Sequence, residues 1–149
     1  MDVLGKINAP IKKLGTVTPL VLRVILGLTM FWHGWKKFDA GLSGTKDFFD
    51  FLSIPLPGVM AFVVAVLELV GGIALVVGIA TRLISVLFII ELLVAVLRYK
   101  YGEDVGFIGA DQAGAELDWA LIAGFFALAT MGAGALLSGD RRLGLDRHS

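Results

Sequence analysis

The sequence predicts an all-α integral membrane protein, a single domain over residues 1–149 folded as a bundle of four transmembrane helices with antiparallel neighbours. Hydrophobic residues make up 57% of the 149 residues and the mean hydropathy is +0.86, which is more apolar surface than one small soluble core can bury. Only 17% of the residues are charged, against about 25% in a typical soluble domain. These charges concentrate between long apolar stretches, as expected where membrane segments alternate with loops in water.

The first two predicted helices both begin beside proline. The first covers residues 18–35, because Thr18 suits the N-cap and Pro19 the first helical position, where its missing N–H donor costs nothing. The second covers residues 58–79 and follows a proline-punctuated entry at residues 54–57. It offers about twenty apolar residues, enough to cross the hydrocarbon core of a bilayer.

The third and fourth predicted helices cover residues 83–97 and 117–137. Only residues 80–82 separate the second helix from the third, so these two helices are expected to form a tight antiparallel hairpin. Residues 99–116 contain four glycines and few apolar residues, which is typical of an irregular loop outside the membrane.

Residues 43–52 mix aromatic and charged side chains between the first and second helices. Phe48, Phe49 and Phe51 alternate there with Lys46 and acidic residues. This composition favours a short helix lying at the membrane interface, because a cluster of phenylalanines needs burial somewhere. The alternative interpretation is an ordinary loop.

Composition also excludes several classes of function. Thirteen basic residues balance thirteen acidic ones. Nucleic acid is therefore not an expected partner, since proteins that bind it carry a basic patch. The absence of cysteine removes disulfide exchange, thiolate nucleophiles, iron–sulfur clusters and thioether-bound haem. His33 is the only histidine near a span and His148 lies in the tail. We therefore predict no intrinsic cofactor and no metal site. Trp32, Trp35 and Trp119 are interpreted as the aromatic belt of one membrane interface.

The distribution of Lys and Arg predicts the orientation. Seven lie on the side of the termini and of the turn between the second and third helices, and five lie opposite: respectively Lys6, Lys12, Lys13, Arg82, Arg141, Arg142 and Arg147, and Lys36, Lys37, Lys46, Arg98 and Lys100. The positive-inside rule then predicts a multi-pass protein of the cell membrane with both termini in the cytoplasm.

Three ionisable residues are expected at membrane depth: Arg23, Glu68 and Glu91. Burying such groups is costly and commonly marks a partner, a cavity or a function. One interpretation is structural, with Arg23 neutralising one or both glutamates and fixing the bundle. One arginine cannot fully neutralise two carboxylates, however. Either one glutamate is protonated, or water or a polar ligand reaches it, and Glu68 and Glu91 then become candidates for a catalytic proton relay with Arg23 as a binding residue.

The helical wheel indicates where Glu68 points. It shares a face with Ala61, Ala65, Gly72 and Leu75, so this face is expected to approach a neighbouring helix across small residues.

A second group of polar residues is expected near the opposite membrane surface and can form one vestibule: His33, Lys36, Lys37, Arg98, Glu116 and Asp118. Among these we take His33, Lys37, Arg98 and Asp118 as candidate binding residues. The alternative for His33 is an ordinary interfacial residue satisfied by its surroundings.

Several of these residues together resemble a known family. Arg23, the segment HGWKKF at 33–38, ELVGG at 68–72, Glu91 and MGAGALLSGD at 131–140 are similar to the DoxX family of small four-helix membrane proteins. The resemblance covers nearly the whole chain.

The resemblance implies membership in membrane-bound oxidoreductase systems, since relatives are linked to quinone-reactive thiosulfate oxidation in archaea and to an oxidoreductase assembly against thiol and oxidant stress in mycobacteria. The family is also similar to eukaryotic cargo receptors and assembly chaperones, so the fold alone does not imply catalysis.

The leading hypothesis is a membrane subunit that holds a quinone or similar apolar redox partner beside Arg23, Glu68 and Glu91. Because the chain lacks a redox cofactor motif, the electron donor is expected on a partner oxidoreductase subunit; a homo-oligomer is also open. The competing hypothesis is a non-enzymatic scaffold or assembly chaperone. A small transporter is less favoured, because the chain is short and shows no inverted repeat.

Overall fold

The computed structural model describes residues 14–103, 105–109 and 113–144. These residues form helices and connecting segments without a strand, which confirms the all-α class. The elements in chain order are α2 (Thr18–Asp39), α3 (Leu42–Phe51), α4 (Pro57–Val77), α5 (Thr81–Ala95), the π-helical turn η1 (Val96–Lys100), α6 (Ala115–Met131) and α7 (Gly139–Arg142). Lys6, Lys12, Lys13, Arg147 and His148, which entered the sequence argument, lie outside the described residues.

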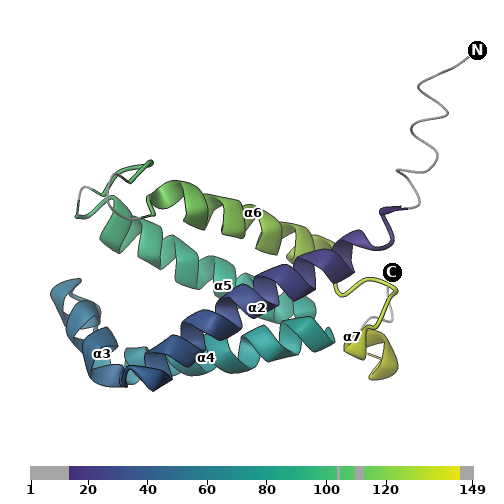
Figure 1. Ribbon diagram of the computed structural model, residues 1–149, viewed down its shortest axis with the longest axis horizontal. Helices are drawn as coiled ribbons and strands as arrows, with labels where there is room; N and C mark the ends of the chain where they lie inside the picture. Colours follow the sequence, from purple (N-terminus) through teal and green to yellow (C-terminus); the bar gives the residue numbers. More distant parts are fainter. Residues whose placement is uncertain (1–13, 104, 110–112, 145–149) are drawn as a thin grey trace, which may run out of the picture.

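Four long helices lie side by side (Figure 1): α2, α4, α5 with η1, and α6. The start of α2 and the short α7 lie at one end of the molecule, and α3 lies at the other. Neighbouring helices run antiparallel. On α2 and α4 this is visible residue by residue, because Gly27 contacts Gly72 whereas Gly34 contacts Ala65.

Small residues allow α2 and α4 to approach at backbone distance. A Cβ atom added to Gly72 would lie 2.6 Å from the Gly27 carbonyl oxygen, and one added to Gly34 would lie 2.9 Å from the Ala65 carbonyl oxygen. Ala61 and Ala65 are fully buried on this face, as are Gly72 and Leu75, and Glu68 is only 4% exposed. The predicted inward face of the second helix is therefore confirmed, and close helix packing explains its glycines.

An apolar core fills the space between the helices on the other side of this contact. Its centre is the ring contact between Phe88 of α5 and Phe125 of α6, whose centroids lie 5.0 Å apart with the ring planes tilted by 37°. Leu26 and Met30 of α2 pack on the same cluster, as does Leu75 of α4. All four long helices thus share one core.

The structure confirms the predicted short helix between the first two long ones and corrects several boundaries. α3 (Leu42–Phe51) coincides with the expected segment 43–52 to within one residue at each end. α2 continues to Asp39, one turn beyond the expected end, so Lys36 and Lys37 lie within the helix. α4 starts at Pro57 and ends at Val77, because Gly78 adopts a left-handed conformation (φ 78°).

The largest boundary error concerns the last helix. α6 ends at Met131, not at residue 137, because Gly132 and Gly134 both have φ of 75°, a conformation that glycine adopts freely and that no helix continues through. The following residues turn back across the end of the molecule and lead into α7, which the sequence did not predict. α5 begins two residues earlier than expected and its last turn is η1.

Within the described residues α4 is the helix that is long and apolar enough by itself to cross a membrane. α2 carries Arg23 and His33 inside its apolar stretch, while α5 and α6 have 15 and 17 residues. The crossing of the membrane by all four helices stays a prediction.

Candidate functional site

An ion pair between α2 and α4 is the most distinctive polar contact of the structure. The Lys37 amino group donates to both carboxylate oxygens of Glu68, at 2.7 Å from Oε1 and 2.5 Å from Oε2. The side chains are 22% and 5% exposed, respectively. Charge-assisted hydrogen bonds this short and this shielded from water hold both side chains in one geometry.

The pair lies on the wall of a cavity of about 600 Å³, which we call the central cavity. This volume is within the range of small-molecule binding sites, about 300–1,000 Å³. Its polar wall is formed by His33 and Lys37 of α2, Glu68 of α4, Glu91 of α5 and Asp118 of α6. The remaining wall is mostly aliphatic and aromatic, with contributions from α3 and η1.

Two carboxylates of the central cavity have an oxygen without a hydrogen-bond partner in the described structure. Glu91 Oε2 and Asp118 Oδ2 are both shielded from solvent and unpaired. Glu91 interacts with Glu68 electrostatically and through a side-chain hydrogen bond, so one ammonium group faces two carboxyl groups. Unsatisfied polar atoms that line a cavity are the groups a polar ligand or a water molecule would satisfy.

Aromatic residues from α3 and η1 form part of the wall of the central cavity. Phe48 of α3 meets the Tyr99 ring edge to face, with centroids 5.0 Å apart, and Phe49 lines the same region. Tyr99 sits in η1, and π-helical turns of this kind re-aim side chains and recur at functional sites. This ring contact joins α3 to η1 at the wall of the cavity.

The structure separates Arg23 from the two glutamates and corrects the expected three-residue group. The Arg23 guanidinium is fully buried and donates to the carbonyl oxygens of Leu136, at 2.9 Å, and Leu137, at 3.3 Å. Fourteen residues separate Arg23 from Lys37 along α2, about 21 Å at the helical rise. Arg23 thus lies at the opposite end of α2, where its hydrogen bonds anchor residues 136–137.

Arg23 interacts electrostatically with the carboxylate of Asp140. Its oxygens accept hydrogen bonds from the backbone N–H groups of Ala80, at 2.6 Å, and Thr81, at 3.0 Å, and thereby satisfy donors at the first turn of α5. The Asp140 N–H donates to the Gly78 carbonyl oxygen at 2.7 Å. Arg23 and Asp140 together fasten the segment after α6 to the turn between α4 and α5.

The other candidate binding residues divide between the central cavity and the surface. His33, Lys37 and Asp118 line the central cavity, so the structure brings these three together with Glu68 and Glu91. Arg98 is exposed on η1 and does not line it. Three of the six residues of the expected vestibule thus share one site with the expected membrane-depth pair of glutamates, whereas Lys36, Arg98 and Glu116 do not line the central cavity.

The Lys37–Glu68 pair is the feature that sequence reasoning missed. The predicted first helix ends at residue 35 and leaves open whether Lys37 still belongs to it, whereas in the structure one more helical turn and a long side chain bring the Lys37 amino group to Glu68. A usable signal was the charge balance, since Glu68 needed a cation on a neighbouring helix and Lys37 lies at the same end of α2 as the start of α4.

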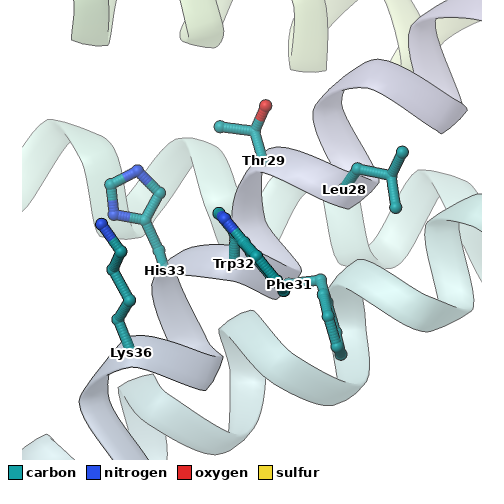
Figure 2. A pocket seen from close by; sticks show the side chains of 6 residues that line it. All are labelled: Leu28, Thr29, Phe31, Trp32, His33 and Lys36. Carbon is teal, nitrogen blue, oxygen red and sulfur yellow. The ribbon is translucent and has the colours of Figure 1, made fainter. Parts of the chain in front are cut away.

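A second hollow lies on the outer surface of α2 and has a volume of about 530 Å³. We call it the α2 groove; all six side chains that line it come from α2 (Figure 2): Leu28, Thr29, Phe31, Trp32, His33 and Lys36. It is the more open of the two hollows and lacks a carboxylate. His33 borders both the α2 groove and the central cavity.

Buried charges around a cavity, together with apolar side chains on the outside, are characteristic of helical membrane proteins. Comparison with known proteins gives the same class: the sequence model of the DoxX family matches residues 18–100. The chain belongs to the DoxX family and is a membrane protein.

Three proteins of known sequence are similar to this chain. The Bacillus subtilis (strain 168) protein named "Putative oxidoreductase CatD" is 41% identical over 85% of this chain and 83% of its own length. Inner membrane protein YphA of Escherichia coli (strain K12) is 31% identical over 83% of this chain and 88% of its own. Inner membrane protein YqjF of the same organism is 35% identical over 48% of this chain and 52% of its own. No solved structure gives a significant match.

Proposed function

We propose that α2, α4, α5 with η1, and α6 each cross the membrane. The distribution of side chains supports this, because all four helices present large apolar residues outward, and α2, α4 and α5 bury polar ones. Ile25 on α2, Ile73 on α4, Ile90 on α5 and Phe126 on α6 are 59%, 49%, 54% and 63% exposed, whereas Arg23 is fully buried. In water such a surface would aggregate; in lipid it is the contact surface.

The termini are cytoplasmic in this proposal, as the positive-inside rule predicts. Arg82, Arg141 and Arg142 lie at the end of the molecule where α2 begins and α7 lies. Lys37, on the opposite side, is neutralised by Glu68, which widens the imbalance. Since the chain lacks cysteine, Ser43→Cys and Arg142→Cys each carry a single thiol. In intact cells a membrane-impermeant maleimide should label Ser43→Cys alone; labelling of Arg142→Cys alone would reverse the orientation.

The central cavity supports a role as the membrane subunit of an oxidoreductase system that binds a quinone or a similar apolar redox partner. The observation that carries this proposal is the combination of aliphatic and aromatic walls with the Lys37–Glu68 pair and the unpaired Glu91 oxygen. A quinone has an apolar ring and two carbonyl acceptors, and it takes up two protons with two electrons when it is reduced to the quinol.

The residues of this chain divide the work by their chemistry. The Lys37 ammonium is a donor for a ligand carbonyl, and Glu68 holds it in place. Glu91 faces Glu68 across the same wall, so the two carboxyl groups can share and relay a proton. Phe48 and Tyr99 supply aromatic surface for the apolar ring of the ligand. The electrons come from a partner subunit, because this chain lacks a redox cofactor motif. The name of the Bacillus relative, "Putative oxidoreductase CatD", supports a redox role for the family.

The test is a titration of the detergent-solubilised protein with a short-chain quinone, followed by tryptophan fluorescence. We expect saturable quenching in the parent protein and weaker binding in Glu91→Gln. Glu103→Gln, an exposed carboxylate outside the cavity, is the matched control and should bind as the parent does. Ala95 lines the central cavity. In Ala95→Phe the larger side chain should occupy space inside the cavity, exclude the quinone and so abolish saturable quenching.

Two outcomes would count against the quinone site. Equal binding by the parent and by Ala95→Phe would place the quinone elsewhere, and no binding by folded parent protein would favour the competing hypothesis of a non-enzymatic scaffold or assembly chaperone.

A further inference from the structure

The α2 groove is elongated, with an apolar end and a polar end, and so complements an amphiphilic molecule. Leu28, Trp32 and Lys36 follow one another at four-residue spacing, and Thr29 and His33 form a parallel row beside them. Two such rows are neighbouring ridges on a helix surface, with a groove running between them along the helix. The groove is therefore apolar at its Leu28 end and polar at its Lys36 end.

The polar end carries a cation that the described structure leaves unpaired. Among the residues described, Lys36 takes part in neither of the two ion pairs and in no hydrogen bond of its side chain. Figure 2 shows its amino group and a ring nitrogen of His33 at the same end of the groove. Two nitrogen groups that converge without a carboxylate between them complement a single anionic group such as a phosphate.

The apolar end offers nothing polar to a ligand. The Thr29 hydroxyl already donates to the Ile25 carbonyl oxygen at 2.9 Å, one turn earlier in the helix. Leu28 and Trp32 are 53% and 59% exposed, so their surfaces are available to an acyl chain. From Leu28 to Lys36 the helix rises about 12 Å, close to the thickness of one leaflet of the hydrocarbon core, about 15 Å.

We propose that the α2 groove binds an anionic phospholipid, with the phosphate at Lys36 and His33 and an acyl chain along Trp32 and Leu28. The register supports this occupant over a second copy of the chain, since a tryptophan beside a lysine at the end of a spanning helix lies at headgroup level. The proposal depends on α2 spanning the membrane and not on the central cavity binding a quinone.

Quenching by brominated acyl chains tests it directly. The Trp35→Phe, Trp119→Phe double variant retains Trp32 as the single tryptophan. It is reconstituted in phosphatidylcholine vesicles with an equal minor fraction of either brominated phosphatidylglycerol or brominated phosphatidylcholine. We expect Trp32 to prefer the anionic lipid about fivefold, the size expected for one interfacial cation at an anionic headgroup.

The control variants decide the outcome. Lys36→Gln in the same background should remove the preference, whereas Lys46→Gln on α3, an exposed lysine 4.0 Å from Asp47, should keep it. The proposal is overturned by equal quenching with both lipids, or by a preference that survives in Lys36→Gln. It is also overturned if neither lipid quenches and the Trp32 emission depends on the protein-to-lipid ratio, because a second copy would then cover the groove. A failure of the quinone titration would leave these results unaffected.

Discussion

Replacing Lys37 by methionine would test whether the Lys37–Glu68 pair holds α2 against α4. Methionine keeps most of the length and the apolar stem of lysine but removes the ammonium group. Glu68 would then lose both of its short hydrogen bonds while Glu91 remains on the same wall. The variant would therefore leave a shielded carboxylate facing another carboxyl group without a cation between them.

The size of the effect follows from the burial of the pair. Removing one partner of a fully buried ion pair costs about 3–5 kcal/mol, because the other charge stays buried and uncompensated. Lys37 is 22% exposed and Glu68 5% exposed, so water screens part of the interaction and we expect a loss of about 2–3 kcal/mol. For a chain of this length that corresponds to a fall in Tm of about 5–10 °C.

Thermal unfolding of the detergent-solubilised protein, followed by intrinsic fluorescence, measures this difference. Lys46→Met removes a lysine from an exposed contact in which both side chains are more than half exposed, so its unfolding temperature should stay within a degree or so of the parent. The double variant Lys37→Met, Glu68→Gln no longer strands the Glu68 charge and should recover most of the lost stability. A Lys37→Met protein as stable as the Lys46→Met control would refute the reasoning, as would a double variant less stable than Lys37→Met.

Three further changes probe the packing around the site. Arg23→Leu should lower the Tm more than Lys37→Met does, because it removes the hydrogen bonds to two carbonyl groups and the electrostatic interaction with Asp140. An unchanged Tm would contradict the anchoring role. Gly72→Ala should destabilise the protein by about 1–3 kcal/mol, since the added methyl group meets α2 backbone atoms at 2.5–2.6 Å, whereas Gly44→Ala meets nothing within 4 Å and should be neutral. Phe48→Ala should speed hydrogen exchange in α3 through loss of the Tyr99 ring contact, and protection equal to that of the parent would show that this contact does not hold α3 in place.

Much of the helical framework was predictable because it is encoded locally. Prolines mark the starts of α2 and α4, and the apolar stretches that follow predict the ends of both helices to within about one turn. The inward face of α4 was also predictable, because Ala65, Glu68 and Gly72 recur at helical spacing and small residues mark a close helix contact. Even the phenylalanine-rich α3 followed from composition.

The pairing of charges was not predictable in the same way. Depth along each helix can be counted from the sequence, and this placed Arg23, Glu68 and Glu91 inside the bundle. Depth does not tell which end of a neighbouring helix meets which residue. A single extra turn of α2 made Lys37 the partner of Glu68, and the bend after α6 made backbone carbonyls the partners of Arg23. Both depend on tertiary contacts that no local pattern reports.

The anchoring of Arg23 has a consequence for how the chain is made. Its acceptors at Leu136 and Leu137 are 113 and 114 residues away in sequence, so the ribosome must synthesise most of the protein before the guanidinium can be satisfied. At roughly 5–20 residues per second, α2 would spend many seconds at the insertion machinery with an uncompensated cation. We expect nascent chains arrested before residue 136 to keep α2 close to the translocon and water, and its release into lipid to follow the arrival of residues 136–140.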